Sequence, residues 1–444
     1  MQVVWLVLLG LLWASMAEAA CSGSGTTWTC PSGSTVADVQ AAHNSATSGY
    51  TITLAVGSYS WGSSTLTLTK AGIVTGTGPD ADLTTTTDTT CNTGTQSCIT
   101  GSGDPIILIA PTSDLSIRVT KLHITRNGGQ PTNNSAGISS AFQVRSPSSA
   151  FPLTLIRVDH NTLDGGVFGL FPNGWIEGVF DHNRLENCQS CIYVGEELYG
   201  NIGAESWTRM YMTFGSGGVA LAGSRHAVFF EDNTFVHTTG GNLDAEPYTD
   251  KGGVIVMRHN TWYVPSGISF FVPLGDHGDN GNFGRGVPIH EDYNNTFHLD
   301  SWCGGYDSIR GGSKLSHDNQ LFGAGCDHGI NITNDGGGPN DTPVNIFIWN
   351  NTINGVAQSA SFVDNSYGAP VLQDQNYFLH APQASGGGCH YTGTPGLQAN
   401  LSCTGSGANP YFGYTPYTYP HPLQSAQGGT DLTPPAAPTG LIVR

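Results

Sequence analysis

A short phrase of the form apolar-x-x-Asn-x-apolar recurs along most of this 444-residue chain. The intervals between its successive Asn residues are 22, 50, 27, 35, 24, 32 and 25, so the basic period lies in the low twenties, with insertions. A period of this length is typical of a stacked array, in which each unit buries its apolar face only against its neighbours. The copies centre on Asn161, Asn183, Asn233, Asn260, Asn295, Asn319, Asn351 and Asn376.

Each unit predicts parallel strands joined by a tight bend at the Asn. A run of β-branched or aromatic residues is followed by two polar residues, the Asn and a second apolar alternation. Asn adopts the left-handed backbone conformation of such a bend at lower cost than most residues. Asn side chains at the same bend of successive rungs can also hydrogen-bond to one another. Because hairpin signals are scarce and parallel connections are right-handed, we expect a right-handed coil.

The two ends of the chain differ from this array, which runs continuously from about residue 150 to 380. Val36, Val39 and Ala42 recur at helical spacing, which predicts one short helix. Residues 426–444 are rich in Gly and Pro and are expected to form a disordered tail. The predicted fold is therefore all-β: a single right-handed parallel β-helix (solenoid) over residues 20–425, with a short N-terminal capping helix and a Pro-rich C-terminal tail.

Residues 1–19 have the features of a signal peptide, with an apolar stretch too short to span a bilayer and small residues at the end. No later segment is apolar enough for a membrane span, so we expect a secreted monomer, either extracellular or periplasmic. Ten cysteines in such a protein predict five disulfides. The local pairings would be Cys21–Cys30, Cys91–Cys98, Cys188–Cys191, Cys303–Cys326 and Cys389–Cys403.

The charge balance limits the possible partners. The chain has 33 acidic and 15 basic residues, which makes it a poor nucleic-acid binder because it repels the phosphate backbone. An anionic polysaccharide would need a local cluster of Arg and Lys or bridging cations.

Several segments together resemble the secreted right-handed parallel β-helix proteins of the pectate-lyase-like superfamily. They are the Asp-His-Asn phrases at 159–161 and 181–183, residues 49–59, Arg310-Gly311-Gly312, and the closing Tyr419-Pro420-His421-Pro422-Leu423. The resemblance covers roughly residues 35–425 and implies a polysaccharide as the partner. It does not supply a catalytic base, because the Arg-x-Pro-x-x-Arg motif of the best-known pectate lyases is absent: a second Arg does not follow Arg145-Ser146-Pro147.

Residues 240–312 hold the densest set of polar residues and the longest insertions, and functional residues commonly lie on such loops. Arg258, Arg285 and Arg310 follow one another at intervals of 27 and 25, about one rung each. A file of guanidinium groups could bind a uronate carboxylate, while Lys251 or His277 abstracts the C5 proton in a β-elimination. The alternative is that these arginines form ion pairs with Glu291 and Asp244 on the outside of the coil.

Two further chemistries are open in the same region. Asp244 and Glu246 alternate along a strand and could serve as the paired carboxylates of a glycoside hydrolase. Asp276, Asp279 and Asn282 lie in an oxygen-rich loop that could hold Ca²⁺, or that is a plain turn. The candidate catalytic residues are Asp244, Lys251, His277, Arg285, Glu291 and Arg310. The candidate substrate-binding residues are Glu246, Arg258 and Trp302.

The sequence thus predicts an exported protein that binds and cleaves a polysaccharide, with β-elimination on a uronate-containing glycan as the leading reaction. The alternatives are a glycoside hydrolase and a non-catalytic carbohydrate-binding or cell-surface structural protein.

Overall fold

The computed structural model describes residues 20–87, 89–127, 140–146, 152–194, 222–238, 247–249, 253–268, 272–276, 287, 289–300, 305–323, 329–333, 343, 345–358, 362–364, 370–374, 376–382, 389–391, 401–403 and 414–426. The predicted signal peptide and residues 427–444 of the predicted tail lie outside these ranges.

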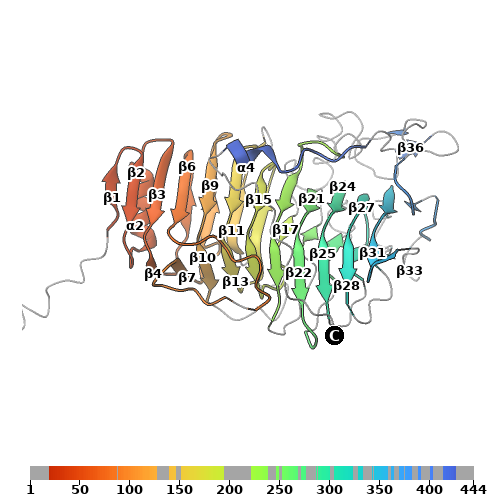
Figure 1. Cartoon of the computed structure of the whole chain (residues 1–444). Coiled ribbons are helices and arrows are strands. Elements are labelled where there is room, and N and C mark those ends of the chain that lie inside the picture. The colour runs from red at the N-terminus through yellow and green to blue at the C-terminus, as the bar shows by residue number, and fades with distance from the viewer. Residues whose placement is uncertain are drawn as a thin grey trace, which may run out of the picture.

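The strands form sheets that run along the length of the molecule (Figure 1). Sheet 1 contains, in chain order, β1 (Ser22–Ser24), β2 (Thr27–Cys30), β3 (Tyr50–Leu54), β6 (Gly72–Gly76), β9 (Ile117–Thr120), β12 (Ile156–Asp159), β15 (Val179–Asp181), β18 (Val228–Glu231), β21 (Val254–Arg258), β24 (Ile289–Tyr293), β27 (Lys314–His317), β30 (Ile346–Trp349) and β34 (Tyr377–Phe378). Sheet 2 contains β4 (Gly57–Gly62), β7 (Ser97–Gly101), β10 (His123–Arg126), β13 (Thr162–Asp164), β16 (Arg184–Glu186), β19 (Thr234–Val236), β22 (Thr261–Val264), β25 (Thr296–Leu299), β28 (Gln320–Phe322), β31 (Thr352–Ile353) and β32 (Val356–Ala357).

The third side of the coil is made by two sheets in succession. Sheet 3 contains β5 (Leu66–Leu68), β8 (Ile107–Ile109), β11 (Ser140–Arg145) and β14 (Phe168–Asn173). Sheet 4 contains β17 (Tyr193–Val194), β20 (Tyr248–Thr249), β23 (Leu274–Asp276), β26 (Asp307–Ile309), β29 (Ile330–Thr333) and β33 (Phe362–Asp364). A bridge between Leu170 and Ile192 links the two sheets. Among the described strands of these four sheets, all pairs are parallel except β1–β2 and β31–β32. A separate antiparallel pair is formed by β35 (Cys389–Tyr391) and β36 (Leu401–Cys403).

The chain visits the three sides in turn, so that β12, for example, pairs with β9 and β15 rather than with its neighbours in sequence. This topology confirms the predicted parallel β-solenoid. Its parallel stacking begins with β2 and β3, well before the residue-150 start of the Asn phrases.

Alternating side chains of each sheet fill the interior. In sheet 2, Phe235, Trp262 and Phe297 are buried in register, with ring centroids 4.4 and 4.6 Å apart. The predicted N-terminal helix is also present: α2 (Val36–Ser45) begins with a capping box between Thr35 and Asp38 and buries one face against the first rungs. The apolar periodicity of the sequence therefore maps directly onto the core.

The repeated Asn residues form the predicted ladder at the turn from sheet 1 to sheet 2. In each step from Asn161 to Asn295, the main-chain N–H and the side-chain Nδ2 both donate to Oδ1 of the next ladder Asn, at 2.9–3.1 Å. The main chain of Asn319 continues the ladder to Asn351. Asn376 is not a member, because it lies just before β34 on sheet 1 and its side chain donates to Pro343.

The left-handed conformation was expected at the ladder Asn, and this is wrong by one position. The residue before each ladder Asn has φ between 53° and 58°; these residues are His160, His182, Asp232, His259, Asn294, Asp318 and Asn350. The ladder Asn therefore has a different role: its carboxamide satisfies backbone groups at a bend where no strand partner is available.

Three of the five predicted disulfides lie within the described residues and have the predicted pairing: Cys21–Cys30, Cys91–Cys98 and Cys188–Cys191. The strands β35 and β36 place Cys389 opposite Cys403. The predicted pair Cys303–Cys326 lies outside the described ranges.

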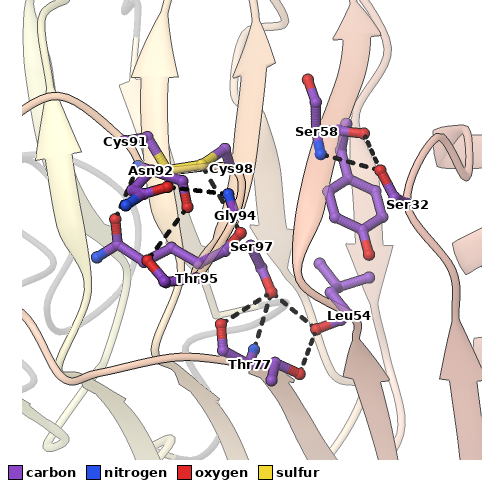
Figure 2. Close-up of a disulfide and its surroundings, with 12 residues drawn as sticks. Ser32, Leu54, Ser58, Thr77, Cys91, Asn92, Gly94, Thr95, Ser97 and Cys98 are labelled. Carbon is purple, nitrogen blue, oxygen red and sulfur yellow. Dashed lines mark hydrogen bonds between the residues drawn. A yellow bond between two sulfur atoms is a disulfide. The ribbon is translucent and has the colours of Figure 1, made fainter.

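Two segments cover the outside of the coil. The first is the sheet 2 cover, residues 77–96 between β6 and β7. Figure 2 shows its base, where Cys91–Cys98 joins the cover to β7 and Ser97 Oγ bonds to Thr77 and to the Leu54 carbonyl. The second is the C-terminal strap, residues 414–426, which includes α4 (Pro422–Ala426) and runs back along the stack to β15 (Figure 1). Within the described residues, none of the helices is both long and apolar enough to cross a membrane.

Candidate functional site

The borders of sheet 4 carry the longest connection in the coil, from Val194 of β17 to Val228 of β18, and several others of more than ten residues. The turn from sheet 1 to sheet 2 takes only His160 and Asn161 between β12 and β13. By contrast, β19 ends at Val236 and β20 begins at Tyr248, while β23 ends at Asp276 and β24 begins at Ile289. Because a rigid coil that carries variable loops is a common scaffold for binding and catalysis, sheet 4 is the best candidate for the functional face.

Three neighbouring strands of sheet 4 end at the same level. Thr249, Asp276 and Ile309, which are the last residues of β20, β23 and β26, are in register. In the sequence, Lys251 comes two residues after the first of these ends, and His277 and Arg310 come directly after the other two. The main-chain N–H of Arg310 donates to the Asp276 carbonyl at 2.8 Å, so that Arg310 continues this edge of the sheet.

Most of the predicted site residues lie outside the described ranges: Asp244, Glu246, Lys251, His277, Asp279, Asn282, Arg285 and Trp302. Their roles stay predictions. The four described ones, Arg258, Asp276, Glu291 and Arg310, occupy three different environments.

Asp276 points into the coil and belongs to a buried charge cluster. Its carboxylate lies 2.7 Å from His290 Nδ1, accepts from Lys314 Nζ at 3.0 Å and accepts from Thr249 Oγ1 at 2.6 Å. Lys314 also contacts Asp307 at 2.7 Å and Asp292 at 3.4 Å. All of the ionisable groups in this cluster are fully buried.

The pKa values of two carboxyl groups in this cluster are shifted in opposite directions. Burial tends to raise the pKa of Asp276, but His290 and Lys314 outweigh it and hold that pKa below its ordinary value. Burial raises the pKa of Asp307 well above its ordinary value. The cluster therefore favours the ionised form of Asp276 beside Lys314 and the protonated form of Asp307, which limits the net charge inside the coil.

This environment does not suit the predicted calcium site. The two oxygens of Asp276 already accept from Thr249 and Lys314, and an ammonium group beside them would repel a cation. Among the described residues, no group of three or more His, Cys, Asp or Glu is arranged to hold a metal ion. Asp279 and Asn282 lie outside those residues, and we derive no step through calcium.

Arg258 and Glu291 lie on the outer face of sheet 1, beneath the C-terminal strap. Arg258 Nε donates to Glu231 at 2.9 Å, and its two Nη atoms donate to the carbonyls of Tyr417 and Thr418 at 2.6 and 2.8 Å. Among the described residues, its ion-pair partner is thus Glu231 of the preceding rung rather than Glu291. Arg258 ends a strand of sheet 1 whereas Arg310 follows a strand of sheet 4, so these two do not stand in one file.

Glu291 is buried with neutral partners. Its carboxyl oxygens accept from the Gly223 N–H at 2.8 Å and from the Tyr414 hydroxyl at 2.7 Å. Burial raises its pKa to about 7, although both hydrogen bonds act in the opposite direction. Its carboxyl group is therefore shielded by the strap and titrates near neutrality.

Sequence reasoning missed both the charge cluster and the charged face under the strap. The first left a signal, because β24 reads Ile-His-Glu-Asp-Tyr and interrupts the apolar pattern of β21 beside it in sheet 1. The second left only the closing Tyr-Pro-His-Pro-Leu phrase, whose partners in the coil are distant in sequence.

No protein-family model matches this chain, and the comparison with curated proteins finds no relative. The geometry of the site is therefore the basis for a functional proposal.

Proposed function

We propose that this protein is an exported polysaccharide lyase, similar to the pectate-lyase-like superfamily, which cleaves a uronate-containing glycan along sheet 4. The supporting observation is the common level at which β20, β23 and β26 end, since Lys251, His277 and Arg310 come within two residues of those ends in the sequence. Parallel strands gather the residues after their carboxyl ends at one edge of a sheet, as this chemistry requires.

In the proposed reaction, each residue has a distinct task. Arg310, with Arg285, neutralises the uronate carboxylate and so increases the acidity of the C5 proton. His277 or Lys251 accepts that proton, the C4–O4 bond breaks, and a C4–C5 double bond forms while the leaving oxygen takes up a proton. Trp302 and Glu246 would bind the neighbouring sugar.

The disulfides support export, because such bonds persist in oxidising compartments. The acidic composition, with 33 acidic against 15 basic residues, makes the local Lys, His and Arg at the edge of sheet 4 the natural docking point for an anionic chain.

The test is the absorbance of a 4,5-unsaturated uronate during incubation with pectate, alginate and glucuronan. We expect a rising signal from the wild-type protein and a loss of at least about a hundredfold in rate in Arg310→Ala and in His277→Ala or Lys251→Ala. Arg145→Ala is the matched control, because this arginine is exposed and ends β11 of sheet 3, which lies three rungs before β20 in the stack.

The alternatives give different outcomes in the same samples. New reducing ends without unsaturated product would indicate a hydrolase that uses Asp244 and Glu246. Binding without either product would indicate a carbohydrate-binding protein and would refute the lyase.

A further inference from the structure

The outer face of sheet 1 beneath the C-terminal strap is rich in buried charged groups. Six ionisable groups lie buried under or beside the C-terminal strap: Arg157, Asp181, Glu231, Asp232, Arg258 and Glu291. Two of them are cationic and four are carboxyl groups. Aromatic rings lie among them, with the Arg258 guanidinium 5.1 Å from the centroid of Phe229 and 5.9 Å from that of Tyr293.

The face carries many charged groups, whereas the strap that covers it carries no acidic side chain and no Lys or Arg. Residues 414–426 also contain no Cys that could tie them down covalently. The strap binds through neutral groups: the hydroxyl of Tyr414 donates to Glu291, the hydroxyl of Tyr419 donates to Asp232, and the N–H of His421 donates to Glu231. Its carbonyls accept from the two arginines.

The same pattern of contacts is what a sugar chain would make. Hydroxyl groups donate to carboxylates and accept from guanidinium groups, and the apolar faces of sugar rings pack on aromatic rings. In the strap, Tyr419 stacks on His259 with centroids 3.8 Å apart, and Tyr417 packs on Phe229 at 5.3 Å. The strap thus presents hydroxyls and flat rings to a surface of carboxylates, guanidinium groups and aromatics.

The aromatic part of this surface extends along the coil to the end of the strap. Tyr293, His317 and Trp349 stack on successive rungs, with centroids 4.8 and 4.2 Å apart. The Tyr414 ring meets His317 and Trp349 edge-on, and Trp349 is only half-buried. A stacked platform therefore leads from the partly exposed Trp349 to the covered Arg258.

We propose that the outer face of sheet 1 is a binding site for a neutral oligosaccharide, which the C-terminal strap occupies as an internal ligand. The ligand is neutral because the four carboxyl groups outnumber the two guanidinium groups, which are already paired with Glu231 and Asp181. A uronate chain would add charge to an acidic strip. This site lies on a different sheet from the proposed lyase site and does not depend on it.

Gly223 provides a way to displace the strap without replacing any side chain of the face. Its φ is +70°, and a Cβ added there would collide with the Thr415 carbonyl oxygen of the strap. Gly355 is the matched control: its φ is +77°, and nothing lies within 4 Å of an added Cβ. Gly223→Ala and Gly355→Ala therefore impose similar backbone strain, and only the first acts on the strap.

The experiment compares the full-length wild-type protein with these two variants. Hydrogen exchange follows the amides of residues 414–426, and calorimetry measures binding of cellohexaose, xylohexaose, mannohexaose and hexagalacturonate. We expect Gly223→Ala to raise exchange in the strap and to bind at least one neutral hexasaccharide at least about tenfold more tightly than the wild type and Gly355→Ala, because the competent state is populated more often.

Three results would overturn the proposal: faster exchange in the strap with no gain in neutral hexasaccharide binding, a gain for hexagalacturonate alone, or an equal gain in Gly355→Ala. Should Gly223→Ala fail to fold by circular dichroism, the double variant Tyr414→Phe/Tyr419→Phe removes two hydroxyl donors with little change in packing. The same gain is expected there, and affinities equal to those of the wild type would refute the site.

Discussion

Arg157 and Gln424 are 267 positions apart in the sequence, yet Nη1 of Arg157 donates to the Gln424 carbonyl at 2.8 Å. The same guanidinium binds Asp181 through Nε and Nη2, at 2.9 and 2.7 Å. Arg258 repeats this arrangement with Glu231 and the strap, and Arg184 repeats it with Glu186 and the sheet 2 cover. Each covering segment is thus held through its backbone by an arginine that is already paired within the coil.

Replacing Arg157 should reduce stability strongly. Arg157→Ala leaves the buried Asp181 without its partner, and breaking one side of a buried ion pair costs about 3–5 kcal/mol. Urea denaturation followed by circular dichroism should show this loss. Arg225→Ala, which removes an exposed arginine at 3.6 Å from Glu177, should change the free energy of unfolding by less than about 0.5 kcal/mol. Equal losses in the two variants would contradict the role assigned to Arg157.

The sheet 2 cover should loosen when Arg184 is replaced. Arg184 donates to the carbonyls of Asp82, Thr85 and Thr87, at 3.0, 2.7 and 2.6 Å. In Arg184→Ala these contacts are lost while Cys91–Cys98 still ties down the base, so we expect limited proteolysis within residues 78–90 to be at least about tenfold faster. The rate of cleavage at sites outside the sheet 2 cover, which should not change, serves as the internal control. An unchanged rate in the cover would mean that other contacts suffice to hold it.

The Asn ladder should be sensitive at every interior step. Asn233→Ala removes the acceptor for two donors of Asn183 and the side-chain donor to the Phe180 carbonyl, whereas Oδ1 of Asn260 keeps the main-chain N–H of residue 233. Unsatisfied buried groups cost about 1–3 kcal/mol each, so we expect a loss of at least about 3 kcal/mol in the free energy of unfolding. Asn44→Ala, at an exposed position of α2, should be nearly neutral. A loss at Asn233 no larger than that at Asn44 would refute the ladder as a stabilising element.

The stability of the protein should depend on pH through Glu291. Burial raises the pKa of this carboxyl group from 4.5 to about 7, so the folded state holds its proton more tightly than the unfolded state. Its contribution to stability is complete below about pH 4.5 and is lost as pH rises through 7. Relative to the wild type, Glu291→Gln should therefore gain about 1–3 kcal/mol between pH 4.5 and 8, measured by urea denaturation at each pH. A difference that does not vary with pH would contradict the raised pKa.

The sequence is informative about the coil because its signals are local and repeated. Val158, Phe180 and Phe230 mark the buried file of sheet 1, and the Asn period marks the turn beside it. The left-handed conformation was assigned one position too late for a simple reason. The residues that adopt it, such as His160, Asp232 and Asn294, differ in identity, whereas the residue after each of them is always Asn.

The candidate site was harder to predict because its contacts join distant rungs. The interval from Arg258 to Arg310 fits two rungs, but it does not show that one residue ends a strand of sheet 1 and the other follows a strand of sheet 4. Nor does it reveal that Arg258 bonds to the preceding rung through Glu231. The choice of partner depends on which acid is buried beside the guanidinium, which only the folded coil determines.

The ladder also gives the coil a direction. Every carboxamide from Asn183 to Asn319 offers its oxygen to the rung before it, and the amide dipoles therefore point the same way along the axis. Such a column can be lengthened by one rung wherever a new turn supplies one more Asn, whatever the length of the loops on the opposite side. In this coil, Asn161 and Asn183 are 22 positions apart, and Asn183 and Asn233 are 50 positions apart. Each of these two steps is nevertheless made by the same pair of hydrogen bonds. Loop variation on the sheet 4 side is thus uncoupled from the register, and new binding surfaces can arise there while the alignment of the strands is preserved.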